Sequence, residues 1–132
     1  MSILIPRTKG VSADTLSNLE NRFEKRLPQS YIAFLQAHDG AAPPDNLFQI
    51  SKNNDARVER FISADECEQM AGTIEGLPKN VVLIAEATGG NFVYLNPDTG
   101  AIFFWDHEVD NDTKLADSFS GFIEMLQPFD PK

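Results

Sequence analysis

The chain has 132 residues, of which 42% are hydrophobic, so it fits one domain with a real core rather than a disordered protein. It carries 11 basic and 20 acidic residues, a net charge of −9, which disfavours nucleic acid as a partner and favours a basic protein. The single cysteine excludes an internal disulfide framework, no apolar run approaches the ~20 residues that cross a bilayer, and the N-terminus lacks a secretory signal pattern. We therefore expect one cytoplasmic domain over residues 1–132, with no membrane partner.

The N-terminal third shows the spacing of two amphipathic helices. The first is expected to begin at Ser12, a good N-cap residue, and to end near Arg26, because Leu27 precedes a proline and is biased away from helical angles. The second begins at Pro28, whose missing N–H costs nothing in the first turn, and ends before Gly40 as a left-handed cap. Its stripe of apolar and aromatic side chains consists of Tyr31, Phe34, Leu35 and His38.

Two short strands and a third helix are expected in the middle of the chain. Residues 46–50 and 57–63 have strand composition and flank a polar loop at 51–56. Ser63 and Glu66 then form the S-x-x-E pattern of a capping box, which opens a short helix through about Ala71.

The C-terminal half predicts three more strands and a closing helix. Residues 80–87 form a continuous run rich in β-branched residues, typical of a buried strand, while residues 91–96 and 101–107 flank a Pro-Asp-Thr-Gly turn. Residues 119–126 form an amphipathic helix that Pro128 stops. Because strands joined by short turns pair antiparallel, we expect an α+β fold. A single antiparallel sheet would carry the N-terminal helix pair, the short middle helix and the C-terminal helix packed against it.

A motif in the first third carries a family resemblance. An acidic helix precedes Leu-Pro, two further residues, an aromatic residue, Phe-Leu and a polar-Gly turn: Glu20, Leu27, Pro28, Tyr31, Phe34, Leu35, Asp39 and Gly40. In this order they resemble the opening of the SUKH superfamily, which includes Smi/Knr-type fungal cell-wall regulators and many bacterial immunity proteins. The Asp-Gly turn departs slightly from the Asn-Gly or Gly-Gly pair common there. A hairpin over 91–108 that ends near Trp-Asp-His-Glu, followed by a closing helix, resembles the second hallmark of the family.

The resemblance implies a SUKH-like α+β domain without known catalytic residues or cofactors. For bacterial members it implies a protein that binds and neutralises a toxin, often a nuclease or a deaminase. For fungal members it implies an intracellular scaffold or regulatory domain that binds a housekeeping partner. We therefore expect a protein-binding module and no enzyme, and the sequence fixes neither the partner nor the oligomeric state.

An acidic run follows the hairpin and could attract a cation. Asp106, Glu108, Asp110 and Asp112 alternate, as oxygen ligands do in a calcium loop. However, Asn111 stands where such a loop needs glycine for its sharp turn, and there is no second, partner loop. A transition-metal site is also disfavoured because His107 is alone locally, while His38 belongs to a helix stripe and is expected to be half-buried or to cap carbonyls. We expect no metal site.

The candidate nucleophile and the candidate acid–base pair are both in poor settings. Cys67 lies between Glu66 and Glu68, whose negative charge disfavours a thiolate. Asp106 and Glu108 lack the burial that would separate their pKa values for acid–base catalysis. No recognisable hydrolase, metalloprotease or phosphate-loop motif is present.

The aromatic hairpin leaves two interpretations open. Phe103, Phe104 and Trp105 fall on both faces of their strand, which fits either a core on both faces or an aromatic surface that meets a partner. The net charge likewise fits either solubility or recognition of a basic protein. The hypothesis we carry forward is a basic toxin domain bound at the acidic end of the hairpin, through Trp105, Asp106, His107, Glu108, Asp110 and Asp112.

Overall fold

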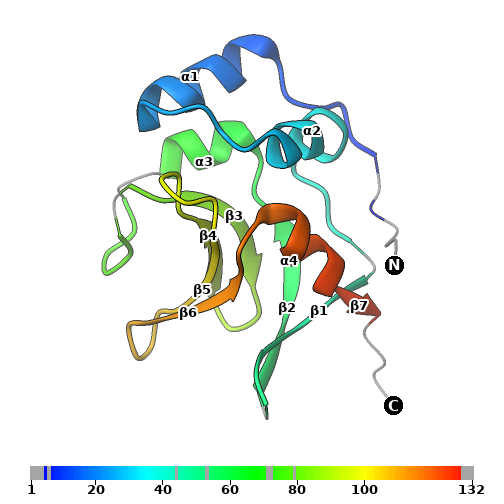
Figure 1. Ribbon diagram of the computed structural model, residues 1–132, viewed down its shortest axis with the longest axis vertical. Coiled ribbons are helices and arrows are strands. Elements are labelled where there is room, and N and C mark those ends of the chain that lie inside the picture. The colour runs from blue at the N-terminus through cyan, green and yellow to red at the C-terminus, as the bar shows by residue number, and fades with distance from the viewer. Residues whose placement is uncertain are drawn as a thin grey trace.

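The computed structural model describes residues 5, 7–43, 45–52, 54–70, 73–78 and 80–128, and it has the α+β architecture that the sequence predicts (Figure 1). The helices in this part of the chain are α1 (Ala13–Phe23), α2 (Gln29–His38), α3 (Ala64–Met70) and α4 (Phe119–Met125). The strands are β1 (Asp45–Ser51), β2 (Asn54–Phe61), β3 (Val82–Ala87), β4 (Asn91–Leu95), β5 (Ile102–Asp106), β6 (Asn111–Ala116) and β7 (Gln127–Pro128). Figure 1 shows α1, α2 and α3 gathered at one end of the sheet, while α4 crosses in front of the strands.

The described strands form one antiparallel sheet in the order β6-β5-β4-β3-β2-β1-β7. The sheet curls, because the rings of Phe48 on β1 and Phe104 on β5 lie 6.0 Å apart although three strands separate them. Phe122 of α4 packs against Phe48 at 5.6 Å, so this helix fills the inside of the curl. Part of the core therefore lies between α4 and the concave face of the sheet, and the same cluster of buried residues continues into α1, α2 and α3.

The N-terminal helices begin where the sequence predicts, but α1 ends earlier. Ser12 caps α1, since its hydroxyl accepts the backbone N–H of Thr15 at 3.1 Å. The helix stops at Phe23 because Glu24 adopts left-handed angles, with φ at 54°. The carboxylate of Glu20 then accepts the backbone N–H of Leu27 at 2.8 Å and fixes the turn into α2. The expected end near Arg26 was thus three residues too late.

The capping box at the start of α3 is confirmed. The Ser63 hydroxyl accepts the N–H of Glu66 at 3.2 Å, and the Glu66 carboxylate accepts the N–H of Ser63 at 3.3 Å. The Asp39 carboxylate adds a third bond, because it accepts the N–H of Ala64 at 2.8 Å. The helix is described to Met70, and the expected end near Ala71 lies outside the described residues.

The strands of the sheet differ from the expectation at three places. The hairpin of β1 and β2 continues through Ser51 and Asn54, so the polar loop is shorter than 51–56. After β5 the chain does not leave the sheet but turns and returns as β6. The sequence predicted only an acidic run after the hairpin at this place. A two-residue strand, β7, also pairs with the far side of β1.

The apolar residues of the family motif lie in the core. Leu27, Tyr31, Phe34 and Leu35 are all buried. The rings of Tyr31 and Phe34 pack edge-on against Phe119 of α4 at 5.1 and 5.0 Å, and Phe34 also contacts Phe61 of β2 at 4.6 Å. The motif therefore ties α2 to both the sheet and α4. Gly40 follows the helix with φ at 75°, the left-handed conformation expected of it.

Candidate functional site

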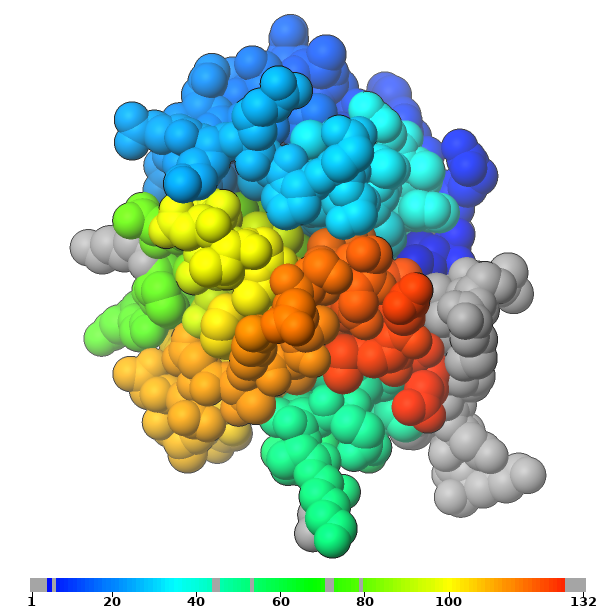
Figure 2. Space-filling model, in the orientation of Figure 1, coloured from blue at the N-terminus to red at the C-terminus, as the bar shows by residue number. Residues whose placement is uncertain are grey.

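The structure places the six predicted partner-binding residues on one hairpin, at the turn between β5 and β6. Trp105 and Asp106 end β5, Asp112 lies on β6, and the turn 107–110 carries the other three, His107, Glu108 and Asp110. Trp105 lies opposite Asp112 in the strand register. Figure 2 shows this hairpin (orange) at the surface, on the side of the molecule away from α1 (blue). Glu108 and Asp110 are exposed.

Trp105 is a buried anchor of the turn and does not form an exposed contact surface. Only 2% of the residue is exposed, and its indole Nε1 donates a hydrogen bond to Asp110 Oδ1 at 3.0 Å. Asp110 reaches this position with left-handed angles, φ 50°, which aspartate tolerates better than most residues. The bond uses one oxygen of the Asp110 carboxylate and leaves the other without a hydrogen-bond partner among the described residues. Trp105 thus fixes the position of a carboxylate at the surface.

Other side chains of the hairpin hold the turn in place. Asp106 Oδ1 accepts the backbone N–H of Glu108 at 3.0 Å. Asn91 Oδ1, on β4, accepts the backbone N–H of His107 at 3.0 Å and lies 2.6 Å from its ring Nδ1, which donates to it. These bonds order the turn, so its outward carboxylates project from a fixed backbone.

Asp112 differs from the acids of the turn because a buried hydroxyl binds it. The phenol of Tyr94 on β4 donates a short hydrogen bond to Asp112 Oδ2. Burial raises the pKa of Tyr94, and the Asp112 carboxylate raises it further. Tyr94 therefore stays a neutral hydrogen-bond donor, and Asp112 helps to join β4 to β6.

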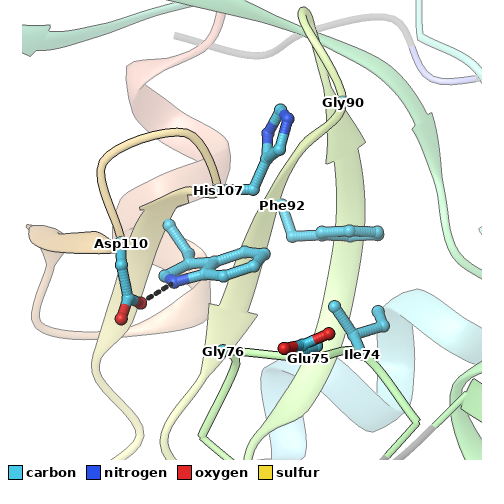
Figure 3. A pocket seen from close by; sticks show the side chains of 8 residues that line it. Ile74, Glu75, Gly76, Gly90, Phe92, His107 and Asp110 are labelled. Atoms are coloured by element: carbon cyan, nitrogen blue, oxygen red, sulfur yellow. Dashed lines mark hydrogen bonds between the residues drawn. The ribbon is translucent and has the colours of Figure 1, made fainter.

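A pocket of about 420 Å³ opens beside the turn, and we call it the Trp105 pocket (Figure 3). Its lining comes from three separate segments: Ile74, Glu75 and Gly76 after α3, Gly90 and Phe92 at the start of β4, and Trp105, His107 and Asp110 of the β5–β6 hairpin. None of the lining residues that the structure describes is a Lys or an Arg. Sequence reasoning had assigned only the three hairpin residues to a site, because the other segments are distant in sequence and reach it through the fold.

Two glycines allow the segments to approach the aromatic wall. Gly76 has φ at 88°, and a Cβ there would lie 3.2 Å from the Trp105 ring. Gly90 has φ at 80°, and a Cβ there would lie 3.3 Å from the His107 ring. Both positions need a left-handed backbone with little space for a side chain, which only glycine supplies without strain. These glycines were the available sequence signal for the pocket.

The aromatic residues of the hairpin form a core on both faces of the sheet. Phe104 packs against Phe48 of β1 on the concave face, while Phe92 stacks on Trp105 at 6.3 Å and Tyr94 stacks on Phe103 at 5.3 Å on the opposite face. Phe92 and Phe103 are only half-buried. Among the described residues the exposed large hydrophobic side chain is Val109, 68% exposed. Phe104 and Trp105 are therefore core residues on opposite faces of the sheet, and the interpretation that part of the aromatic surface meets a partner stays a prediction for the half-buried Phe92 and Phe103.

The described residues contain no grouping of three or more His, Cys, Asp or Glu side chains able to hold a metal ion. Cys67 is fully buried, and burial raises the pKa of its thiol to about 12, which makes it a poor nucleophile. Burial, not the neighbouring glutamates, is the main cause. His38 is half-buried with its ring 5.2 Å from that of Phe34. No helix in the described part of the chain is long and apolar enough to cross a membrane.

Comparison with known proteins agrees with the motif. A model of the SMI1/KNR4 family (SUKH-1) matches residues 10–125, from the segment before α1 to the end of α4. The chain belongs to this family. The matched range includes the Leu-Pro and Phe-Leu residues of the motif, the closing helix and all six hairpin residues. The chain is also 40% identical over 140 residues to the SPbeta prophage-derived uncharacterized protein YokK of Bacillus subtilis (strain 168), covering 86% of this chain and 73% of that protein.

Proposed function

We propose that this SUKH-1 protein is a non-catalytic binding module that neutralises a toxin domain, and that the acidic β5–β6 turn meets the toxin. The observation that carries the proposal is the charge of this turn. Asp106, Glu108 and Asp110 lie close together, and none of the ion pairs among the described residues includes their carboxylates. Their hydrogen bonds come from the turn itself and from Trp105. The turn therefore presents negative charge that no basic side chain among the described residues neutralises through an ion pair.

A basic partner is the chemistry that complements this surface. A toxin that cleaves nucleic acid needs a positive surface to bind phosphates, and that surface would be attracted to the turn. Complementary charge mainly accelerates encounter and excludes wrong partners, while a buried contact beside it supplies the lasting affinity. The Trp105 pocket lies next to the turn and offers a place for such a contact. The family and the prophage origin of the Bacillus subtilis relative support a role in conflict between cells or genetic elements.

Co-expression tests the proposal directly. A toxin domain encoded beside this protein is expressed from an inducible promoter in a sensitive bacterium, with and without this protein. Survival only in its presence, together with co-purification of the two proteins, is the expected result. Death of the cells despite abundant, folded protein contradicts the proposal. Recovery of the same housekeeping protein in pull-downs, with no protection from any neighbouring toxin, would instead favour a scaffold or regulatory role.

A further inference from the structure

We propose that the Trp105 pocket receives an arginine side chain of the partner. The inference deepens the proposed function, because it names the chemical group that the acidic end of the hairpin would recognise. It rests on three features of the pocket: an aromatic wall, carboxylates at separate edges, and the lack of a basic side chain among the lining residues that the structure describes.

The wall of the pocket suits a planar cation. Phe92 and Trp105 stack with their ring planes 27° apart and their centroids 6.3 Å apart, so they form one aromatic wall, and because Trp105 is only 2% exposed, Phe92 supplies the accessible ring area. Phe92 is half-buried and leaves part of its ring open to the pocket. A guanidinium group that lies over such a surface is attracted by the electrons of the ring face. Its flat shape also fits against the rings better than the compact ammonium group of lysine does.

The carboxylates supply the ionic contacts. Figure 3 shows Asp110 and Glu75 at two separate edges of the pocket. Asp110 is held by the indole of Trp105 and keeps its second oxygen for a ligand, while Glu75 has no hydrogen bond or ion pair among the described residues. A guanidinium group has five N–H donors in a rigid arrangement, so one group can reach carboxylates on two sides.

The size of the pocket is consistent with this occupant. Its volume of about 420 Å³ lies within the range of roughly 300–1,000 Å³ of pockets that enclose small ligands. Ile74 adds an apolar wall on the side of the loop after α3, against which the methylene groups of an arginine could lie. A toxin that binds phosphates displays arginines on its active surface, so an occupied pocket would also cover part of that surface.

The chain contains one tryptophan, and it lies in the wall of this pocket, so its fluorescence reports on binding directly. The peptide acetyl-Gly-Arg-Gly-amide is titrated into the full-length protein, and the same peptide with citrulline in place of arginine serves as the neutral control. We expect a saturable change with the arginine peptide in the millimolar range, and affinity for the citrulline peptide weaker by about tenfold. In NMR spectra the shifted resonances should include the Trp105 indole N–H and the amides of Gly76 and Gly90.

Variants separate a specific pocket from general attraction to an acidic protein. Glu75→Gln should lower the affinity for the arginine peptide by about threefold to tenfold. Glu124→Gln removes the same charge from an exposed position on α4 and should leave this affinity unchanged. Phe92→Leu keeps an apolar residue and should weaken binding by about threefold through loss of the ring. Equal responses to the arginine and citrulline peptides, equal effects of the two glutamate variants, or no saturable response would overturn the inference.

The peptide experiments and the co-expression experiment can fail independently of each other. If the protein protects cells from the toxin but the arginine peptide fails these tests, the pocket inference is wrong and the neutralising role stands. If the peptide binds as described but no toxin is neutralised, the pocket is an arginine site and the proposed function is wrong.

Discussion

Two clusters on this protein contain carboxylates in different settings: in one they bind an arginine, and in the other they lack a cation among the described residues. In the first, the guanidinium of Arg60 on β2 binds both oxygens of Glu66 on α3 at 2.7 and 2.9 Å, and it contacts Glu86 on β3 at 2.5 Å. In the second, the turn after β5 presents Asp106 and Glu108 without a cation from the described part of the chain. The first cluster connects a helix to two strands, whereas the second leaves its charge facing outwards.

The difference shows which acids serve the fold and which are available to a partner. Both carboxylates of the Arg60 cluster have a cation as partner, and the hydrogen bonds from Arg60 lower the pKa of Glu66 to about 2. Asp106 and Asp110 accept hydrogen bonds that order the turn, but no cation among the described residues pairs with them or with Glu108. A negative charge kept in a fixed position without an internal partner destabilises the fold slightly and is useful mainly for recognition.

The largest effect should follow from reversing the charge of the turn. With Asp106→Lys, Glu108→Lys and Asp110→Lys combined, association with the toxin should slow by about 10-fold to 100-fold at low salt, because attraction becomes repulsion. Stopped-flow mixing measures the rate, and circular dichroism checks the fold. The matched control reverses three exposed acids elsewhere, Asp14, Glu59 and Glu124.

The salt dependence of the association rate provides a second measurement of the same effect. The rate of the unmodified protein should fall as salt rises, and the turn variant should lose that dependence while the control retains most of it. Equal rates for the turn variant and the control would mean that overall charge, not this turn, attracts the partner.

Removing the cation of the first cluster should have the next largest effect, and it should act on stability. In Arg60→Met, Glu66 and Glu86 lose their shared partner, and the free energy of unfolding should fall by about 1–2 kcal/mol. The estimate is modest because the three side chains are 35%, 41% and 34% exposed, so water screens them. Urea unfolding measures it.

The control for this prediction is Lys25→Met, which breaks an ion pair whose side chains are 47% and 69% exposed. We expect it to change the free energy of unfolding by less than about 0.5 kcal/mol. If the two variants are equally stable, the Arg60 cluster contributes no more than an ordinary surface pair, and the contrast with the turn disappears.

The smallest effect is a pH dependence of stability that comes from Glu66. Its hydrogen bonds with Arg60 hold the folded pKa at about 2, below the ordinary value of 4.5. The stabilisation is therefore complete above about pH 4.5 and is lost as the pH falls towards 2, because the unfolded chain takes up the proton first. The difference in unfolding free energy between the unmodified protein and Glu66→Gln should shrink over this interval. A difference that stays constant from pH 5 to pH 2 contradicts the assignment.

Short-range patterns in the sequence were sufficient to predict the helices and the central strands of the sheet. The caps at Ser12 and Ser63 were recognisable because they depend on residues within one turn of the chain. The buried faces of α2 and α4 were recognisable because apolar residues recur at helical spacing. The hairpin of β4 and β5 followed from its turn residues and its dense aromatic content.

The elements that the sequence reading missed depend on contacts distant in sequence. β6 is an edge strand whose first residues are exposed, so it lacks the apolar run that identifies a buried strand. β7 has two residues and exists because β1 offers an unpaired edge. The acidic run was predicted to follow β5, but the hairpin that it forms with β6 was not, and the Trp105 pocket needed Glu75 and Phe92 from two other segments. Aromatic composition left burial and exposure of this strand open, and Trp105 is buried.

The central claim, that the partner binds at the acidic turn and the Trp105 pocket, is tested most directly by hydrogen–deuterium exchange on the complex with the neutralised toxin. We expect slower exchange at residues 105–112 and 74–76 when the toxin is bound, with little change on α1. Protection confined to the groove between α2 and α4, lined by Phe34, Phe119 and Ile123, with the turn unchanged, would contradict it.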